Sequence, residues 1–412
     1  MKVAAIIAEY NPFHKGHEYL FQETRRLTGA DHIIVVMSGD FTQRGTPAIA
    51  DKYLRAHMAL LGGADLILEL PIHYACSSAE FFAKGAVTLL NKLGVVDVLC
   101  FGSESGDPKK LWPIARVLAD EPAEYRQHLR TFMRRGMSYP LARNQALEMT
   151  IPDFAEYEDI VKCPNNILAI EYLKELLRSD AAMEAFTIRR IGGDYHDQRL
   201  NTNFSSAISI RQCLLLGNPL SMIKEQIPDN CHELLEHSVG RYFPIFSNDF
   251  SDLLRYRLLL ERKSGYTGYA DVPANLSDRI QKNLLQMESI EQFCDLLKTK
   301  NMTHARISRS LGHILLGIRQ EEMDALLSNG LVHYARILGF RSSCSQLLKM
   351  IKKNASIPLI SKPADAAMQL SAEGLAQFER DIEASHIYEM IAASKFAHPF
   401  SNEYQRQIIR ID

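Results

Sequence analysis

Short apolar segments alternate with amphipathic helical patterns along the first half of this chain. The apolar segments are nearly continuous, as expected of strands that are covered on both faces. They occupy residues 2–8, 32–37, 65–70 and 97–101, with a weaker candidate at 186–191. Helical patterns fill the intervals at residues 16–27, 51–61, 78–93 and 108–147. The alternation predicts a doubly wound α/β fold with a parallel sheet, in which ligands bind beyond the carboxyl ends of the strands.

The alternation stops near Gly217-Asn218-Pro219, which is a turn signal. Beyond this turn helical periodicity dominates, at residues 249–261, 276–298, 304–318, 320–328, 332–338, 345–353 and 375–392. We therefore predict two domains, an α/β domain at residues 1–217 and a mainly α-helical domain at residues 218–412.

The composition is that of an ordinary globular protein. The chain has 412 residues, of which 46% are hydrophobic, and its 47 basic and 49 acidic residues give a net charge of −2. No apolar run reaches the roughly 18 residues of a membrane span. The seven cysteines are scattered without C-x-x-C spacing, which indicates reduced thiols rather than zinc sites or disulfides. We expect a cytoplasmic protein without membrane association, and the sequence does not indicate its oligomeric state.

The first predicted strand leads into a segment with the residue types of a phosphate site, residues 11–17 (NPFHKGH). The Asn-Pro pair favours a turn at the end of the strand, and the next helix presents free N–H groups and the positive end of its dipole there. His14 and His17 lie three residues apart, on one side of the first helical turn. Both imidazoles can donate to phosphate oxygens, more strongly as charge builds on a leaving pyrophosphate. The alternative is a structural role for both rings.

A second candidate phosphate contact lies late in the α/β domain, at Ser205, Ser206 and Arg211. The serines are expected at a helix N-terminus, where their N–H and O–H groups can hold phosphate and the arginine can clamp it. Together the two segments resemble the nucleotidylyltransferase superfamily, which carries H-x-G-H after its first strand and S-S-T-x-x-R near the end of the fold. Here Ala207 replaces the usual threonine, and the arginine comes one residue later.

Three longer stretches resemble the bacterial tRNA(Met) cytidine acetate ligase family. They are AIIAEYNPFHKGH at residues 5–17, MSGDFTQRG at residues 37–45 and ADLILELP at residues 64–71. The resemblance implies an enzyme that converts ATP and acetate into acetyl-adenylate and pyrophosphate. It further implies transfer of the acetyl group to the exocyclic amine of the wobble cytidine of elongator tRNA(Met), which gives N4-acetylcytidine.

The resemblance also implies which residues bind ATP. They are Ile7, Ala8, Glu9, Tyr10, Asn11, Pro12, Phe13, His14, Lys15, Gly16, His17, Glu18, Tyr19, Leu20, Gly102, Asn165, Arg190, Ile191, Ser205 and Ser206. For Gly102 a plain strand-to-loop glycine is an equal alternative, and for Asn165 the alternative is a helix cap. Arg189 and Arg190 end the last predicted strand, where two cations are unusual unless they face an anion.

The expected catalytic residues are His14, His17, Asp40 and Arg44. The histidines stabilise pyrophosphate, whereas Asp40 and Arg44 shape the acetate end, with Arg44 pairing with the carboxylate. An Asp–Arg ion pair that orders the loop is the alternative. Lys52, at a helix start where cations are disfavoured, is expected to face a phosphate. No carboxylate cluster indicates a metal site built by the protein, so Mg²⁺ is expected to bind mainly through the phosphates.

Three windows lack acidic residues although the whole chain is balanced: residues 126–143, 298–319 and 325–364. Because a solvated helix surface normally mixes both signs, these windows indicate a large anionic partner, here the tRNA. Pairing with acids from elsewhere in the fold is the alternative. The candidate RNA-binding residues are Arg306, Arg309, Arg336, Arg341, Lys349, Lys352 and Lys353.

Two other functions fit part of this pattern. A small-metabolite adenylyltransferase would share the phosphate motifs, but it needs neither the basic windows nor a helical half. A non-catalytic RNA- or nucleotide-binding module would bind ATP without releasing pyrophosphate.

Overall fold

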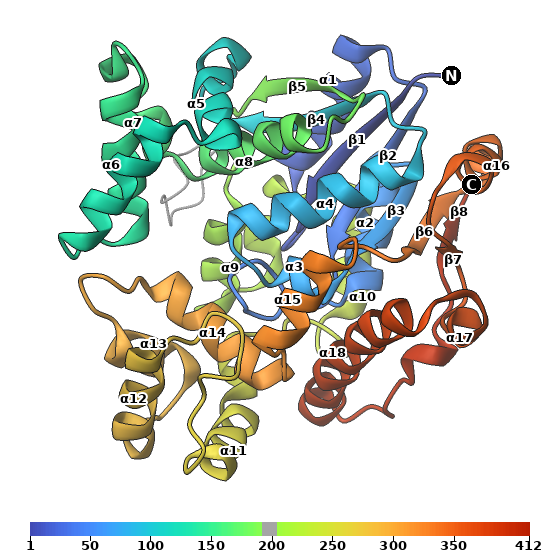
Figure 1. The fold of residues 1–412 in the computed structure, drawn as a ribbon. Helices are drawn as coiled ribbons and strands as arrows, with labels where there is room; N and C mark the ends of the chain where they lie inside the picture. Colours follow the sequence, from blue (N-terminus) through green and yellow to red (C-terminus); the bar gives the residue numbers. More distant parts are fainter. Residues whose placement is uncertain (192–203) are drawn as a thin grey trace.

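The computed structural model describes residues 1–191 and 204–412. Their strands form one eight-stranded sheet in the order β5-β4-β1-β2-β3-β6-β7, with β8 also paired to β6 (Figure 1). The strands are β1 (Val3–Ala8), β2 (His32–Ser38), β3 (Leu66–Leu70), β4 (Val98–Ser103), β5 (Glu184–Arg189), β6 (Ala335–Arg341), β7 (Leu359–Ile360) and β8 (Ile409–Ile411).

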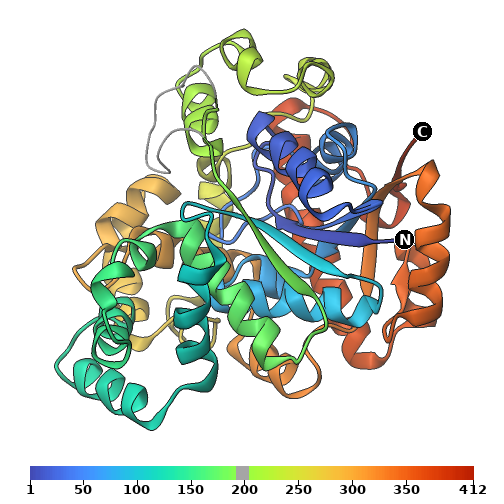
Figure 2. The same ribbon diagram turned by 90° about the horizontal axis from the view of Figure 1, so that it is seen from above.

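Helices cover the sheet and continue into a helical part of the chain (Figures 1 and 2). They are α1 (Lys15–Thr28), α2 (Lys52–Leu61), α3 (Ile72–Ala75), α4 (Ala79–Leu93), α5 (Pro108–Asp120), α6 (Ala123–Arg134), α7 (Tyr139–Thr150), α8 (Pro164–Arg178), α9 (Ala207–Leu215), α10 (Asp229–Ser238), α11 (Ser251–Glu261), α12 (Ala274–Asn283), α13 (Ile290–Leu297), α14 (His304–Leu316), α15 (Gln320–Ser328), α16 (Ser345–Asn354), α17 (Ala366–Gln369) and α18 (Ala372–Phe396). Within the described residues, none of them is long and apolar enough to cross a membrane.

The first five strands confirm the predicted parallel sheet. β1 pairs in parallel with β2 and β4, β2 pairs with β3, and β4 pairs with β5. Helices from the crossovers bury both faces: α1, α2, α9 and α10 pack on one face, and α4, α5 and α8 pack on the other. All five strands therefore end at the same edge, where the helix N-termini that follow them also lie.

The second half of the chain returns to this sheet. The helix predicted at residues 332–338 is wrong, because β6 occupies residues 335–341 and runs antiparallel to β3. β7 and β8 then pair in parallel with β6. A short apolar run has no periodicity that separates a strand from a buried helix, and here the open edge of β3 supplies the hydrogen-bonding partners. Residues beyond 218 thus extend the sheet begun by residues 1–217.

Helices α11 to α15 and α18 surround an apolar core of their own. Leu254 of α11, Phe293 of α13, Ile314 of α14 and Tyr388 of α18 belong to it. Phe41, which follows β2, and Ile72, which follows β3, enter the same core. Because both of these residues lie just beyond strand ends, the helical part packs against the carboxyl edge of the sheet.

Candidate active site

A cavity of about 290 Å³ opens at the carboxyl edge of the sheet, where the fold predicts a ligand. The ends of β1, β4 and β5, the first turns of α1, α8 and α9, and the loop at residues 42–46 form its walls. Expected ATP-binding residues that line it are Ile7, Ala8, Glu9, Tyr10, Asn11, His14, Gly16, His17, Tyr19, Leu20, Gly102, Asn165, Arg190, Ile191, Ser205 and Ser206. Pro12, Phe13, Lys15 and Glu18 lie outside the lining, and the Phe13 ring packs against Tyr10 and Phe21 instead.

His14 and His17 stack at the start of α1 with their ring centroids 3.8 Å apart. His14 is the N-cap, and its Nδ1 accepts a hydrogen bond from the backbone N–H of Gly16 at 3.1 Å. Nδ1 of His17 accepts from the backbone N–H of His14 at 3.2 Å. Since both Nδ1 atoms are acceptors, each neutral ring carries its proton on Nε2. The helix start therefore selects the tautomer in which Nε2 of each ring is a donor.

The environment keeps both imidazoles neutral. Burial lowers the pKa of His14 to about 3, and the charges of Arg190 and Arg211 add to the effect. Burial, followed by the nearby His14 and Arg190, lowers the pKa of His17 well below its ordinary value. Two neutral rings can stack at this separation without mutual repulsion, and both can donate to an anion without first gaining a proton.

α9 brings a second set of donors to the same cavity. Ser206 is the N-cap of this helix, and its Oγ accepts a hydrogen bond from the backbone N–H of Ser209 at 3.1 Å. Arg211, in the next turn, donates from Nη1 to the backbone carbonyl of Asn11 at 2.6 Å. This bond ties α9 to the turn before α1. The helix N-terminus, Arg211 and Arg190 give the cavity a positive wall suited to phosphates.

Glu104 supports the site from behind and was missed by the sequence reasoning. Its Oε1 and Oε2 accept hydrogen bonds from the backbone N–H groups of Asn165 and Asn166 at 3.2 and 2.8 Å. Oε1 also accepts from Nδ2 of Asn165 at 2.7 Å. The carboxylate thus caps α8 and holds Asn165 in the cavity wall. Its place two residues beyond Gly102, just past a strand end, is the signal that points to it.

The loop after β2 closes another side of the cavity. Its lining residues are Thr42, Gln43, Arg44 and Thr46. The backbone N–H of Gln43 donates to Oε1 of Glu9 at 2.8 Å. Arg55, which sequence reasoning missed, is fully buried and donates to the backbone carbonyls of Glu9, Ser38, Gly39 and Ala50. One guanidinium therefore fixes the ends of β1 and β2 relative to α2.

The chain is similar along most or all of its length to a protein family and to individual bacterial proteins. The family model described as HIGH Nucleotidyl Transferase matches residues 1–403. The tRNA(Met) cytidine acetate ligase of Acetivibrio thermocellus is 38% identical, over 99% of this chain and 100% of its own. The protein of the same name from Clostridium kluyveri is 42% identical over 88% of this chain and 90% of its own. A crystal structure of Thermotoga maritima TmcAL bound with alpha-thio ATP is 30% identical and superimposes with a TM-score of 0.91, with 100% of both chains covered. The chain belongs to the tRNA(Met) cytidine acetate ligase family.

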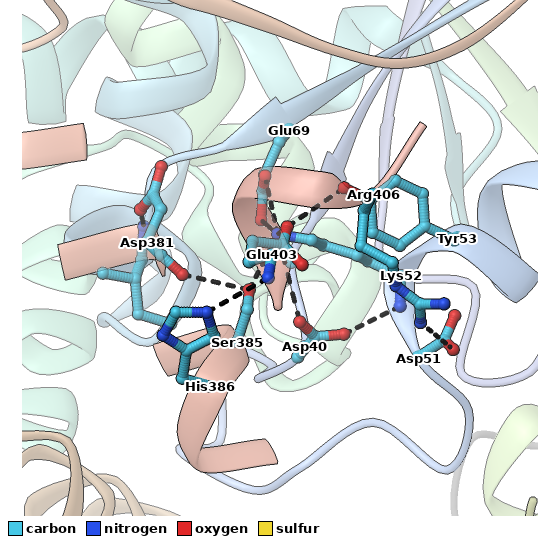
Figure 3. Close-up of polar contacts among 12 residues, drawn as sticks. Asp40, Asp51, Lys52, Tyr53, Glu69, Asp381, Ser385, His386, Glu403 and Arg406 are labelled. Atoms are coloured by element: carbon cyan, nitrogen blue, oxygen red, sulfur yellow. Dashed lines mark hydrogen bonds and ion pairs between the residues drawn. The ribbon is translucent and has the colours of Figure 1, made fainter. Parts of the chain in front are cut away.

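Two charged residues expected at the ligase cavity lie instead in a buried ion cluster (Figure 3). Asp40 does not line the cavity, and its Oδ1 accepts a hydrogen bond from the backbone N–H of Lys52 at 2.8 Å. The Lys52 ammonium pairs with Glu69 at 2.8 Å and with Glu403 at 2.7 Å. The predictions that Asp40 shapes the acetate end and that Lys52 faces a phosphate are therefore wrong. Arg44 does line the cavity.

Acids from elsewhere in the ligase fold neutralise part of the basic window at residues 298–319. Arg306 pairs with Asp271 at 3.2 Å, and Arg309 donates to the same carboxylate from two nitrogens, at 2.9 and 2.7 Å. Asp271 lies on the loop before α12, so the two arginines anchor that loop to α14. The alternative of pairing within the fold accounts for these two side chains.

The window at residues 325–364 is also partly engaged inside the protein. Arg336 on β6 is 1% exposed and pairs with Glu69 at 3.1 Å and with Glu403 at 2.5 Å. The prediction that Arg336 contacts RNA is therefore wrong, because its guanidinium is inaccessible. Arg341 donates to the backbone carbonyls of Leu60, Ala64 and Asp412.

Exposed cations gather on two separate surfaces of this ligase. The first, which we call the hairpin surface, combines α6, α7 and the turn at residues 298–302, joined by a hydrogen bond from Nδ2 of Asn301 to the carbonyl of Gly136 at 3.5 Å. Its exposed cations are Arg126, Arg130, Arg134, Arg135, Lys298 and Lys300. The second is α16, which exposes Lys349, Lys352 and Lys353. Figures 1 and 2 place α16 on the opposite side of the molecule from α6 and α7.

Proposed function

We propose that this protein is an ATP-dependent ligase that acetylates N4 of the wobble cytidine of elongator tRNA(Met), acting in the cytoplasm. Acetate and ATP first give acetyl-adenylate and pyrophosphate. The acetyl group then passes to the cytidine amine, and AMP is released. The observation that carries the proposal is the stacked, neutral imidazole pair, each ring with its donor on Nε2, in a chain that matches ligases along its full length.

The first step needs positioning and charge stabilisation rather than a protein nucleophile, because acetate carries its own negative charge. A carboxylate oxygen attacks the α-phosphorus of ATP, the bond from that phosphorus to the bridging oxygen breaks, and pyrophosphate leaves. His14 and His17 donate hydrogen bonds to the departing pyrophosphate. Arg190, Arg211 and the N-terminus of α9 hold the rest of the phosphate chain.

Mg²⁺ is proposed to bind through the phosphates. Among the described residues, no group of three histidine, cysteine or carboxylate side chains is arranged to hold a metal ion. Mg²⁺ commonly keeps several waters and uses substrate phosphates with one or two carboxylates, which suits a cavity lined by four arginines and a single carboxylate among the described residues. The ion would neutralise charge on the phosphates during the first step.

The hairpin surface is the proposed docking site for the tRNA. It is joined to the cavity because Arg143 of α7 pairs at 3.1 Å with Glu171 of α8, the helix whose first turn lines the cavity. Its six exposed cations suit a phosphate backbone, and the side chain of Tyr139 is 47% exposed and can stack with a base. A base in a loop can leave its stack and enter a cavity. The three α16 lysines remain a separate prediction.

One assay separates the candidate functions. The purified protein is incubated with ATP, Mg²⁺, labelled acetate and elongator tRNA(Met), and both pyrophosphate and RNA-bound label are followed. Acetate-dependent pyrophosphate together with label in N4-acetylcytidine supports the ligase. Pyrophosphate release that requires a small nucleotide acceptor instead would support a metabolite adenylyltransferase, and ATP binding with neither product would support a binding module.

A further inference from the structure

Glu9 is a carboxylate in the wall of a cavity that is otherwise built for anions. Of the described residues that line the cavity, it is the only one with a carboxylate, whereas four arginines line the same space: Arg44, Arg189, Arg190 and Arg211. The side chain follows directly after β1 and is half-buried. A carboxylate in this position repels both ATP and acetate. Its presence therefore calls for a partner that donates a proton or a hydrogen bond.

The surrounding residues hold Glu9 in place. Its backbone carbonyl accepts a hydrogen bond from Nη1 of the buried Arg55 at 2.6 Å, and its Oε1 accepts from the backbone N–H of Gln43 at 2.8 Å. The bond to the loop at residues 42–46 thus uses Oε1 of Glu9 and leaves Oε2 out of that contact. A carboxylate so fixed is arranged to act on a ligand group rather than to move with solvent.

Two buried donors beside Glu9 lack a partner in the described part of the chain. They are the hydroxyl of Tyr172, whose residue is 2% exposed, and Nε2 of Gln43. Burial, and then the charge of Glu9, raise the pKa of Tyr172 well above its ordinary value, so its hydroxyl stays protonated. Buried donors require acceptors, and both of these side chains line the cavity. A ligand oxygen, such as the carbonyl oxygen of an acyl group, meets that requirement.

The lining of this cavity is also suited to a methyl group. Ala79, Phe82 and Phe101 line the cavity, and the ring of Phe101 lies 5.7 Å from that of Tyr172. The cavity that Glu9 lines therefore offers both donors for an acyl oxygen and an apolar surface for its methyl group. The amine that attacks the acyl carbon must enter this same cavity.

We propose that Glu9 receives the exocyclic amine of the cytidine and acts as the general base of acetyl transfer, an inference that rests on the proposed function. The N4 nitrogen forms a bond to the acyl carbon, the bond from that carbon to the AMP oxygen breaks, and AMP leaves with that electron pair. One N4 proton passes to the carboxylate of Glu9 and then to solvent. A carboxylate that accepts a hydrogen bond from the cytosine amino group also favours cytidine over uridine, which has a carbonyl there.

The test is the Glu9→Gln variant, whose amide oxygen still accepts the hydrogen bond from Gln43 while the basic carboxylate is lost. Two rates are measured separately on the full chain: acetate-dependent exchange of labelled pyrophosphate into ATP, and transfer of labelled acetyl to tRNA(Met) in a single turnover. Because Glu9 also lines the ATP cavity, the two rates are compared at saturating ATP, and we expect transfer to fall by roughly 100-fold or more relative to exchange, the usual contribution of a general base. Glu9→Asp should recover part of the transfer rate. Glu23→Gln, an acid on α1 outside the cavity lining, is the matched control and should change neither rate.

Other outcomes overturn the inference in distinguishable ways. Equal loss of both rates in Glu9→Gln would assign Glu9 to adenylate formation, and recovery of exchange on adding Mg²⁺ would assign it to the metal ion. Transfer at the wild-type rate in the variant would remove the base role while leaving the ligase function intact. If the wild-type protein forms adenylate but never labels tRNA, the proposed function itself fails.

Discussion

Environment, rather than residue type alone, sets the chemistry of His14 and His17. An imidazole in water titrates near pH 6.5, so a solvated pair would be partly charged at neutral pH. Here burial and the adjacent arginines hold both rings neutral, and two backbone N–H groups occupy their Nδ1 atoms. The result is a pair of donors ready for the charge that develops on pyrophosphate.

Replacing His17 with alanine tests this pair at the scale of one residue. His17→Ala should lower acetate-dependent pyrophosphate exchange by about 100- to 1,000-fold, the usual cost of removing one donor to a developing anion. The exposed His237 on α10 offers a matched control, and His237→Ala should exchange at the wild-type rate. Circular dichroism checks that both variants are folded. Exchange at the wild-type rate in His17→Ala would contradict the role given to the imidazole.

The lowered pKa of His14 has a consequence for stability. Between about pH 3 and pH 6.5 the unfolded chain binds a proton at this position and the folded chain does not, so stability is lost as the pH falls through this window. The His14 contribution should approach about 1.4 kcal/mol per pH unit. In His14→Asn, which keeps a good N-cap residue, urea unfolding should become less dependent on pH by about that amount. An unchanged pH dependence would mean that His14 is solvated.

At the scale of elements, the loop at residues 42–46 depends on close packing against α14. Gly45 has a φ of +70°, and a Cβ on Gly312 of α14 would lie 2.5 Å from the carbonyl oxygen of Gly45. Backbone rather than a flexible side chain opposes that Cβ, so the loop can approach only a glycine. This contact holds one wall of the cavity against the helical part.

Gly312→Ala should therefore push the loop away from the helix. We expect a loss of about 1–3 kcal/mol in the free energy of unfolding, as for other overpacked sites, together with a raised KM for ATP because a cavity wall moves. Gly268→Ala is the control, since its Cβ would meet just one side-chain atom, at 3.5 Å. Chemical denaturation and pyrophosphate exchange at varied ATP concentration measure the two effects. Wild-type values for both in Gly312→Ala would contradict the packing argument.

Reversing the charge of two exposed arginines on α6 tests whether the hairpin surface binds tRNA. Arg130→Glu with Arg134→Glu should weaken tRNA binding at least tenfold and lower the salt dependence of affinity, while acetate-dependent pyrophosphate exchange continues. The control is Lys2→Glu with Arg26→Glu. It reverses two charges near the amino ends of the strands, where β1 begins and α1 ends, and this double variant should bind tRNA normally. Filter binding at several salt concentrations gives both quantities. Equal affinity in the two double variants would place the tRNA elsewhere.

At the scale of the whole molecule, a buried ion cluster joins segments from both ends of the chain. Lys52 and Glu69 come from the first half, and Glu403 comes from the last residues (Figure 3). The half-buried pair of Asp51 and Arg406 lies beside them and joins the same two segments. Burial alone would raise the pKa of Glu403, but Lys52 and Arg336 lower it to about 2, so this carboxylate stays charged. Breaking such a cluster leaves uncompensated charge in a dry interior.

Arg336→Met removes one cation from this cluster and should destabilise the fold by about 3–5 kcal/mol. Arg410→Met, on the neighbouring strand β8, changes an exposed arginine in the same way and should cost no more than about 0.5 kcal/mol. Equilibrium unfolding in urea compares the two variants with the wild type. Similar stabilities of both variants would mean that the cluster contributes little to folding.

Features whose physics is local can be predicted from the order of the residues alone. The parallel strands, the helices between them and the histidine motif at the end of β1 follow from short-range apolar periodicity and from which side chains a helix start can hold. The placement of His14, His17 and Arg211 at one cavity follows from the rule that strand ends share an edge of the sheet.

Features that depend on partners distant in sequence become visible when the chain is folded. Lys52 meets Glu403 across 351 positions (403 minus 52), and Arg336 meets Glu69 across 267 (336 minus 69), so no local pattern separates these buried cations from ones that bind phosphate or RNA. β6 is a strand because the edge of β3 was open to it. The neighbours of a buried charge or of a short apolar run determine whether it is structural or functional. The packing of the whole chain determines those neighbours.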